Sequence, residues 1–148
     1  MVPAANATLT FTGDVQNSTY NDTVADRQYA GILFTNDGSA GKTNAFTLAG
    51  NSITTGNITT TANTSGSTIT DIISLELIMN GNRIFTTNQQ SGSVQHNLTL
   101  SGIISESGAR SLTKQGAGTL TLNGSASNTF AGGVIVNGGL LVLGALTP

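Results

Sequence analysis

Short runs in which apolar and polar residues alternate recur along the whole chain, and each run stops at Gly or Asn. Clear examples are residues 7–13, 45–50, 97–102 and 118–124. Alternation with period two puts successive side chains on opposite faces of a strand, and Gly and Asn favour tight turns. Helical spacing is missing, because Gly, Thr and Asn interrupt every window of about a dozen residues. The pattern predicts an all-β chain.

The runs also repeat at a nearly constant spacing. Residues 98–102 (LTLSG) match residues 120–124 (LTLNG) 22 positions later, and 141–144 follow after a further 21. Residues 75–77 lie 23 positions before Leu98. This spacing is typical of solenoid repeats, and the pattern of leucine-rich repeats is missing. We therefore expect a right-handed parallel β-helix of about six or seven coils, with a jelly roll or sandwich as the alternative.

A β-helix predicts which side chains lie inside. Equivalent residues of successive coils stack in columns, with apolar side chains inward and Thr, Ser and Asn outward. Because stacked strands lie about 4.8 Å apart, the coils would form a rod about 30 Å long. The predicted inward set is Leu9, Phe11, Phe46, Leu48, Leu75, Leu77, Leu98, Leu100, Leu120, Leu122, Val134, Val136, Leu141 and Leu143.

Composition excludes several classes of function. Charged residues are 8 % of the 148, and five basic residues provide no patch for a nucleic-acid backbone. No run of about 18 apolar residues occurs, so we expect no membrane insertion by this segment. Cys is absent and His96 is the single histidine, which excludes thiolate and multi-histidine metal sites. We expect neither a metal nor a cofactor.

One stretch resembles the end of a phosphate-binding loop. Residues 41–43 read Gly-Lys-Thr after a strand-like run, but Asn36 stands where that loop requires glycine. The loop also needs a helix behind it, so that backbone N–H groups meet phosphate, and the strand-like 45–50 follows instead. We interpret this stretch, residues 34–43, as a polar turn between coils.

The remaining titratable residues form no catalytic pattern in the sequence. Asp22, Asp26 and Arg27 are the one local cluster of charges, which we interpret as a solvated loop rather than a hydrolytic or Ca²⁺ site. His96 has no acid or nucleophile beside it in the sequence. We therefore predict that His96 is an exposed turn residue and that the chain is not an enzyme.

Residues 112–144 read LTKQGAGTLTLNG followed by SASNTFAGGVIVNGGLLVLG. This segment resembles the autotransporter-associated β-strand repeat, also called the passenger-associated transport repeat. Residues 128–130 stand for the Asn-Thr-Tyr of that family, and residues 132–133 for its double glycine. Two departures are the extra residues 126–127 and Val134 in place of Thr. The resemblance covers about a quarter of the chain and implies a secreted or surface β-helical passenger without catalytic residues.

Two groups of residues carry the structural expectations. The predicted turn and repeat positions are Gly102, Gly116, Gly118, Gly124, Asn128, Gly132, Gly133, Gly138 and Gly139. Between residues 133 and 144 both faces of the strands are apolar, so another coil or another chain should cover the second face. The predicted assembly surface there consists of Ile135, Leu140 and Val142.

Together these observations predict one β-helical domain over residues 1–148, as a fragment of a longer protein. We expect a structural segment of a bacterial secreted or cell-surface protein, a stalk or scaffold that assembles end to end into fibres. Its partners would be further copies or other surface proteins. The alternative is an adhesin-type module that binds a glycan or a host protein through Thr and Asn ladders and the loops 14–30 and 60–72.

Overall fold

The computed structural model describes residues 4–13, 18–35, 45–62, 66–89 and 94–144, and all regular structure within them is β-strand. Sixteen strands of these residues form three sheets, and every pair of neighbouring strands is parallel. Consecutive strands belong to different sheets, and each of the first eleven strands pairs with the strand three places further along the chain. Within the described chain the twelfth strand has no such partner, and the thirteenth and fourteenth pair with the strands two places further. The predicted parallel β-helix is confirmed.

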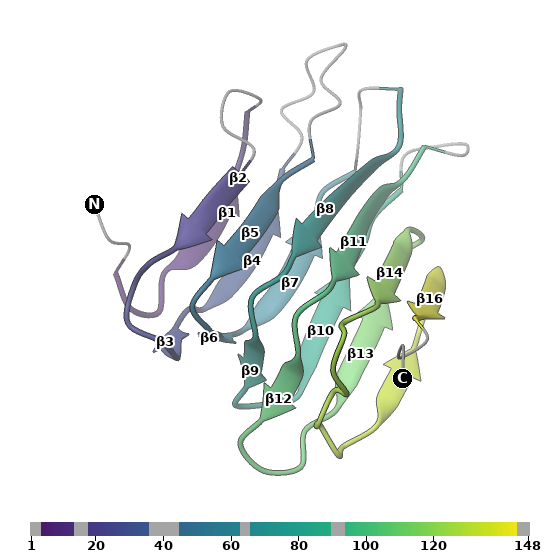
Figure 1. The fold of residues 1–148 in the computed structure, drawn as a ribbon. Coiled ribbons are helices and arrows are strands. Elements are labelled where there is room, and N and C mark those ends of the chain that lie inside the picture. The colour runs from purple at the N-terminus through teal and green to yellow at the C-terminus, as the bar shows by residue number, and fades with distance from the viewer. Residues whose placement is uncertain (1–3, 14–17, 36–44, 63–65, 90–93, 145–148) are drawn as a thin grey trace.

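The sheets share one stacking direction, and Figure 1 shows their strands side by side from the purple to the yellow end of the molecule. Sheet A contains β1 (Thr8–Phe11), β4 (Gly31–Phe34), β7 (Asn57–Thr60), β10 (Arg83–Thr86), β13 (Leu112–Gln115) and β15 (Val134–Val136). Sheet B contains β2 (Ser18–Asn21), β5 (Thr47–Gly50), β8 (Ile69–Ile73), β11 (His96–Leu100), β14 (Thr119–Leu122) and β16 (Leu140–Leu143). Sheet C contains β3 (Arg27–Gln28), β6 (Ile53–Thr55), β9 (Leu77–Met79) and β12 (Ile104–Glu106).

The solenoid has four complete turns of three strands, followed by two turns with strands in sheets A and B alone. The number of full coils is therefore slightly lower than the predicted six or seven. In the fifth turn the chain still passes beside β12, because the backbone N–H of Thr129 donates to the carbonyl of Ile104 at 3.0 Å. The Asn128 side chain accepts the N–H of Ile104 at 2.8 Å, so a side-chain bond replaces the strand there.

The register confirms the spacing at the C-terminal end and corrects it upstream. Leu98 pairs with Leu120, and Leu120 pairs with Leu141, as the echoes of 22 and 21 residues predicted. The echo between Leu75 and Leu98 is wrong, because Leu98 pairs with Asp71. Connections between sheets A and B explain the difference: 87–95 joins β10 to β11, whereas 116–118 joins β13 to β14.

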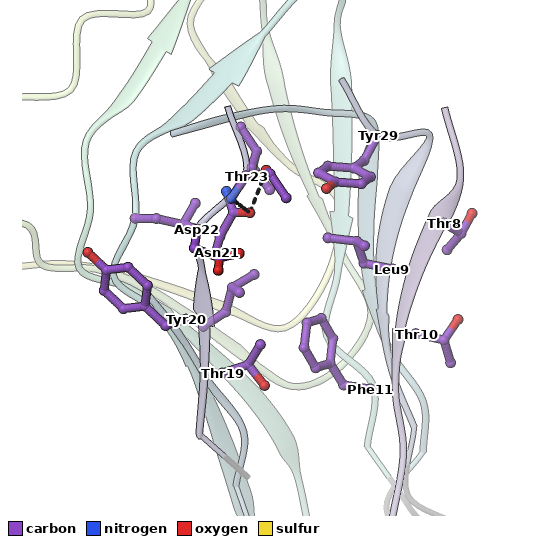
Figure 2. A pocket seen from close by; sticks show the side chains of 13 residues that line it. Thr8, Leu9, Thr10, Phe11, Thr19, Tyr20, Asn21, Asp22, Thr23 and Tyr29 are labelled. Atoms are coloured by element: carbon purple, nitrogen blue, oxygen red, sulfur yellow. Dashed lines mark hydrogen bonds between the residues drawn. The ribbon is translucent and has the colours of Figure 1, made fainter. Parts of the chain in front are cut away.

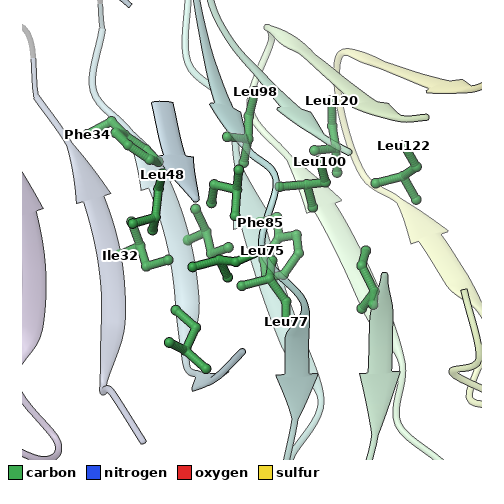
Figure 3. Close-up of a cluster of buried hydrophobic side chains, with 14 of the residues drawn as sticks. Ile32, Phe34, Leu48, Leu75, Leu77, Phe85, Leu98, Leu100, Leu120 and Leu122 are labelled. Atoms are coloured by element: carbon green, nitrogen blue, oxygen red, sulfur yellow. The ribbon is translucent and has the colours of Figure 1, made fainter. Parts of the chain in front are cut away.

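Most of the predicted inward residues form the core, part of which Figure 3 shows. Eight of them are buried: Phe46, Leu48, Leu75, Leu77, Leu98, Leu100, Leu120 and Leu122. Leu9, Phe11 and Leu141 are half-buried and pack against this core. Val134, Val136 and Leu143 stand at inward positions, in line with the buried Leu112, Lys114 and Leu122, but they are exposed. No strand of the described chain stacks on the outer edge of β15 or β16.

Corner glycines let one turn approach the next. A Cβ atom on Gly102 would lie 2.0 Å from the carbonyl oxygen of Leu75, and one on Gly132 would lie 2.1 Å from the backbone of Arg110. Gly116 and Gly139 combine such an approach with positive φ angles of 78° and 65°. Gly133 also has positive φ, but open space surrounds it.

Gly118, Gly124 and Gly138 complete the predicted glycine positions. Cβ atoms there would lie 2.9, 3.1 and 3.4 Å from the nearest backbone oxygen, and their φ angles are not positive. Tight neighbours therefore constrain these three positions less than they constrain Gly116.

Replacing Gly116 by Ala should destabilise the fold far more than replacing Gly66. Both residues have a positive φ angle, which costs a side chain about 1–2 kcal/mol. At Gly116 the added Cβ would also lie 2.2 Å from the carbonyl oxygen of Thr87, whereas at Gly66 nothing lies within 4 Å. We expect a loss of about 3 kcal/mol or more for Gly116→Ala and about 1 kcal/mol for Gly66→Ala. Urea unfolding followed by circular dichroism measures both, and equal losses would contradict the packing at this corner.

Candidate functional site

The interior corner between sheets A and B changes character along the stack. In the first two turns it is aromatic, with ring centroids 5.0 Å apart for Phe11 and Phe34 and 6.1 Å apart for Phe34 and Phe46. From the third turn onward this corner also contains buried polar or charged side chains: Thr60, Asp71, Thr87, His96 and Lys114. In sheet A the change falls between neighbours in register, because Phe34 pairs with Thr60. A charged interior in a solenoid requires partners for every group.

His96 and Asp71 form a buried pair in this corner. The Nε2 atom of His96 lies 2.6 Å from Oδ2 of Asp71, and the two residues are 2 % and 0 % exposed. Oδ1 of Asp71 accepts the backbone N–H of Phe46 at 2.8 Å. Nδ1 of His96 lies 2.8 Å from the carbonyl oxygen of Thr61. The pair thus connects strands or strand ends from three successive turns.

The prediction of an exposed His96 without a partner acid is wrong. Asp71 lies 25 residues earlier in the chain, but the register pairs His96 with Ile69 and so makes Asp71 its diagonal neighbour on the inward face. One sequence signal could have indicated this contact. Asp71 stands at an inward position between Ile69 and Ile73, and His96 stands two residues before the inward Leu98.

Lys114 is the second buried charge of the corner. Its Nζ atom donates to the carbonyl oxygens of Gln115 at 2.8 Å, Gly116 at 2.8 Å and Gly138 at 3.0 Å. Burial lowers the pKa of Lys114 below its ordinary value of 10.5. Because Gly138 belongs to the sixth turn, the ammonium group ties the last two turns together. In the sequence Lys114 is the last residue of the Leu-Thr-Lys motif, and the motif alone does not indicate that this lysine is buried.

Charged side chains outside the core gather along sheet C. The described ones lie on its strands, at the two flanking corners or, for one residue, at the start of β10 in sheet A: Asp22, Asp26, Arg27, Glu76, Glu106, Arg110 and, on β10, Arg83. Several hold neighbouring turns together. Glu76 accepts the hydroxyl of Ser105 at 2.6 Å, and Glu106 accepts the backbone N–H of Ala131 at 2.7 Å. Within the described chain, the outward faces of sheets A and B therefore carry no charge.

The sequence cluster of Asp22, Asp26 and Arg27 lies at the corner between sheets B and C. Asp26 accepts the hydroxyl of Ser52 at 2.6 Å and has a φ angle of 63°, so it serves a turn. The described residues contain no group of three or more His, Asp or Glu side chains that could hold a metal ion. The Gly-Lys-Thr stretch lies in 36–44, outside the described residues.

An apolar cavity of about 520 Å³ opens at the N-terminal end of the solenoid. Figure 2 shows Leu9, Phe11 and Tyr29 around it, whereas Thr8 and Thr10 lie on the opposite face of β1, the strand that carries Leu9 and Phe11. Its floor consists of core side chains from later turns: Leu48, Ile53 and Leu75. The cavity is the inside of the first turn, seen where no described strand stacks on β1 or β2.

The opposite end is also apolar. Ile135, Leu140 and Val142, the predicted assembly surface, are exposed on the outward faces, in line with Thr113, Thr119 and Thr121. No other coil of the described chain covers them. They sit next to the exposed inward residues Val134, Val136 and Leu143, so aliphatic side chains cover both faces of this last turn. In the part of the chain that the structure describes, no helix is long and apolar enough to span a membrane.

Stacked parallel strands, apolar columns and close corner glycines define a repeat protein of the parallel β-helix class. The sequence model of the passenger-associated-transport-repeat family matches residues 112–143. The last two turns of the solenoid are therefore such a repeat, as the resemblance predicted. Searches of curated proteins and of solved structures found no significant match.

Replacing Lys114 by Met should destabilise the last two turns. Met fills a similar volume but cannot donate, so the carbonyl groups of Gln115, Gly116 and Gly138 lose their common partner. We expect a loss of about 2–4 kcal/mol in the free energy of unfolding. The outward neighbour provides the control, since Thr113→Met should change stability by less than about 1 kcal/mol. A Lys114→Met variant as stable as this control would show that the three hydrogen bonds contribute nothing.

Proposed function

We propose that the chain is a structural segment of a β-helical passenger in a bacterial secreted or cell-surface protein, where it serves as a stalk or scaffold. The observation that carries this proposal is the continuous register of sheets A and B through all six turns. Each turn adds about 4.8 Å of length and is bonded to the next along two sheets. The passenger-associated repeat at 112–143 supports the extracellular setting. A rigid rod needs no reactive site.

The finer part of the proposal is assembly end to end. The sheet A column that begins with Leu9 runs through Ile32, Ile58, Phe85 and Lys114 to Val136. Both terminal residues of this column are at least partly exposed, and no described strand pairs with the outer edges of the end strands β1 and β15. A second copy stacked on this end would place its Leu9 over Val136. Such a head-to-tail contact does not close on itself and therefore produces filaments.

Axial assembly predicts filaments in a concentration series of the purified chain. Negative-stain microscopy and light scattering should show rods much longer than the ~30 Å of one copy. Val136→Glu should abolish them by placing a charge in the stacked core, whereas Ile135→Glu should leave them intact. The two residues are adjacent and similarly exposed, at 49 % and 51 %, but face inward and outward respectively. Compact monomers of the wild-type chain at every concentration would refute axial assembly, and the role as a rigid segment would then be tested by small-angle scattering.

The charge-free outward faces favour a second candidate, an adhesin-type surface for a neutral glycan or a host protein. Thr70, Thr99, Thr119 and Thr121 face outward on sheet B, and Asn97 stands in line with Thr70 and Thr119. Hydroxyl and amide groups in such ladders can hydrogen-bond sugar hydroxyls without a charge. The loops 14–30 and 60–72 are described only in part.

A glycan and host-protein binding screen tests this candidate. If sheet B is the binding face, Thr121→Lys should weaken the affinity for any hit at least about tenfold, because a lysine interrupts the uncharged ladder. Thr54→Lys on the outward face of sheet C is the matched control and should leave affinity unchanged. Equal affinity of both variants would exclude sheet B as the binding face.

A further inference from the structure

The two ring nitrogens of His96 both face oxygen atoms that accept hydrogen bonds. Nδ1 lies 2.8 Å from the backbone carbonyl of Thr61, which has no proton to offer. Nδ1 must therefore carry the hydrogen of this bond. Nε2 lies 2.6 Å from Oδ2 of Asp71. Oδ1 of the same carboxylate is already occupied by the backbone N–H of Phe46, so Oδ2 is the atom that remains for the ring.

We propose that the folded solenoid holds His96 as the imidazolium, paired with the carboxylate of Asp71, and that this pair is a proton-dependent lock between the third and fourth turns. A neutral ring with its hydrogen on Nδ1 would turn the Nε2 lone pair toward the carboxylate. A neutral ring with its hydrogen on Nε2 would turn the Nδ1 lone pair toward the carbonyl oxygen of Thr61. Water cannot relieve either repulsion, because both side chains are fully buried.

The backbone of His96 extends the lock to neighbouring strands. Its carbonyl oxygen accepts the hydroxyl of Thr60 at 2.8 Å, and its N–H donates to the carbonyl oxygen of Asn88 at 2.9 Å. The hydroxyl of Thr60 in turn accepts the N–H of Asn88 at 3.1 Å. Movement of the imidazole would therefore disturb the ends of β7 and β10 as well as β8 and β11.

No other described charge contacts the pair. The residues that surround the pair on neighbouring elements are uncharged. They are Thr60 and Thr61 at the end of β7, Asn88 after β10 and Phe46 before β5. Lys114 of β13 directs its ammonium group to the carbonyls of Gln115 and Gly116 in the fifth turn and of Gly138 in the sixth. Asp37 and Lys42 lie outside the described residues. Asp71 is thus the group that balances the imidazolium.

Nitrogen NMR of the wild-type chain tests the proposal without any substitution. His96 is the only histidine, so ¹⁵N-labelled protein gives one pair of ring nitrogen signals. We expect both signals at the positions of a protonated nitrogen at about pH 7.5, well above the value near 6.5 at which a free imidazole loses its proton. One signal at the position of an unprotonated nitrogen would overturn the proposal.

The stability of the wild-type chain and of Asp71→Asn should differ in pH dependence. On this proposal the folded wild type keeps one proton that the unfolded chain releases as the pH rises, so its folding constant should fall with pH, by at most about tenfold per pH unit. The asparagine side chain of the variant would keep its oxygen on the N–H of Phe46 and donate its amide to Nε2 of a neutral ring. The variant should then lose this slope and show one unprotonated ring nitrogen. Parallel slopes of the two proteins would refute the lock. If Asp71→Asn does not fold, the ring signals of the wild type and its own slope still decide the question.

Discussion

Hydrogen bonding between parallel strands of successive turns is the interaction on which the whole molecule depends. It sets the distance between turns at about 4.8 Å, so every inward side chain meets an equivalent one directly above and below. Leu98, Leu120 and Leu141 form one such column. The same distance leaves no space for a Cβ atom where corners meet, as at Gly102 over Leu75. The apolar columns and the glycines at the corners therefore both follow from the distance between successive turns.

The buried charged residues in the corner between sheets A and B make the inward columns unequal from turn to turn. A stack of equivalent leucines would tolerate a shift in register, because every neighbour is alike. Asp71, His96 and Lys114 do not tolerate it, since each has partners at one place alone. A shifted register would leave buried charges without hydrogen bonds, which costs several kcal/mol for each group. These groups therefore disfavour the alternatives that a purely apolar column would allow.

Charged side chains on the surface are also distributed unevenly among the three sheets. Acidic and basic side chains lie along sheet C and its corners, where they bond to neighbouring turns, and the outward faces of sheets A and B, as far as the structure describes them, remain uncharged. The last turn, which lies within the transport repeat, exposes aliphatic side chains on both faces.

Local alternation was sufficient to predict the all-β class, because the period of two is encoded within each strand. The near-constant spacing of the repeated runs added the solenoid and, with it, eight core residues. The glycine spacing of residues 112–143 was sufficient to indicate the transport repeat, because short corners keep the period constant there. Only the tertiary structure decided three other features: the length of the turns before residue 98, the pairing of Leu98 with Asp71, and the contact between His96 and Asp71. These three features depend on the number of residues in each connection between two sheets. Alternation within a strand does not indicate which residues of two strands a connection of that length brings into register. The exposure of Val136 and Leu143 has the same origin, since their pattern is that of buried residues and only the stacking of turns shows that nothing described covers them.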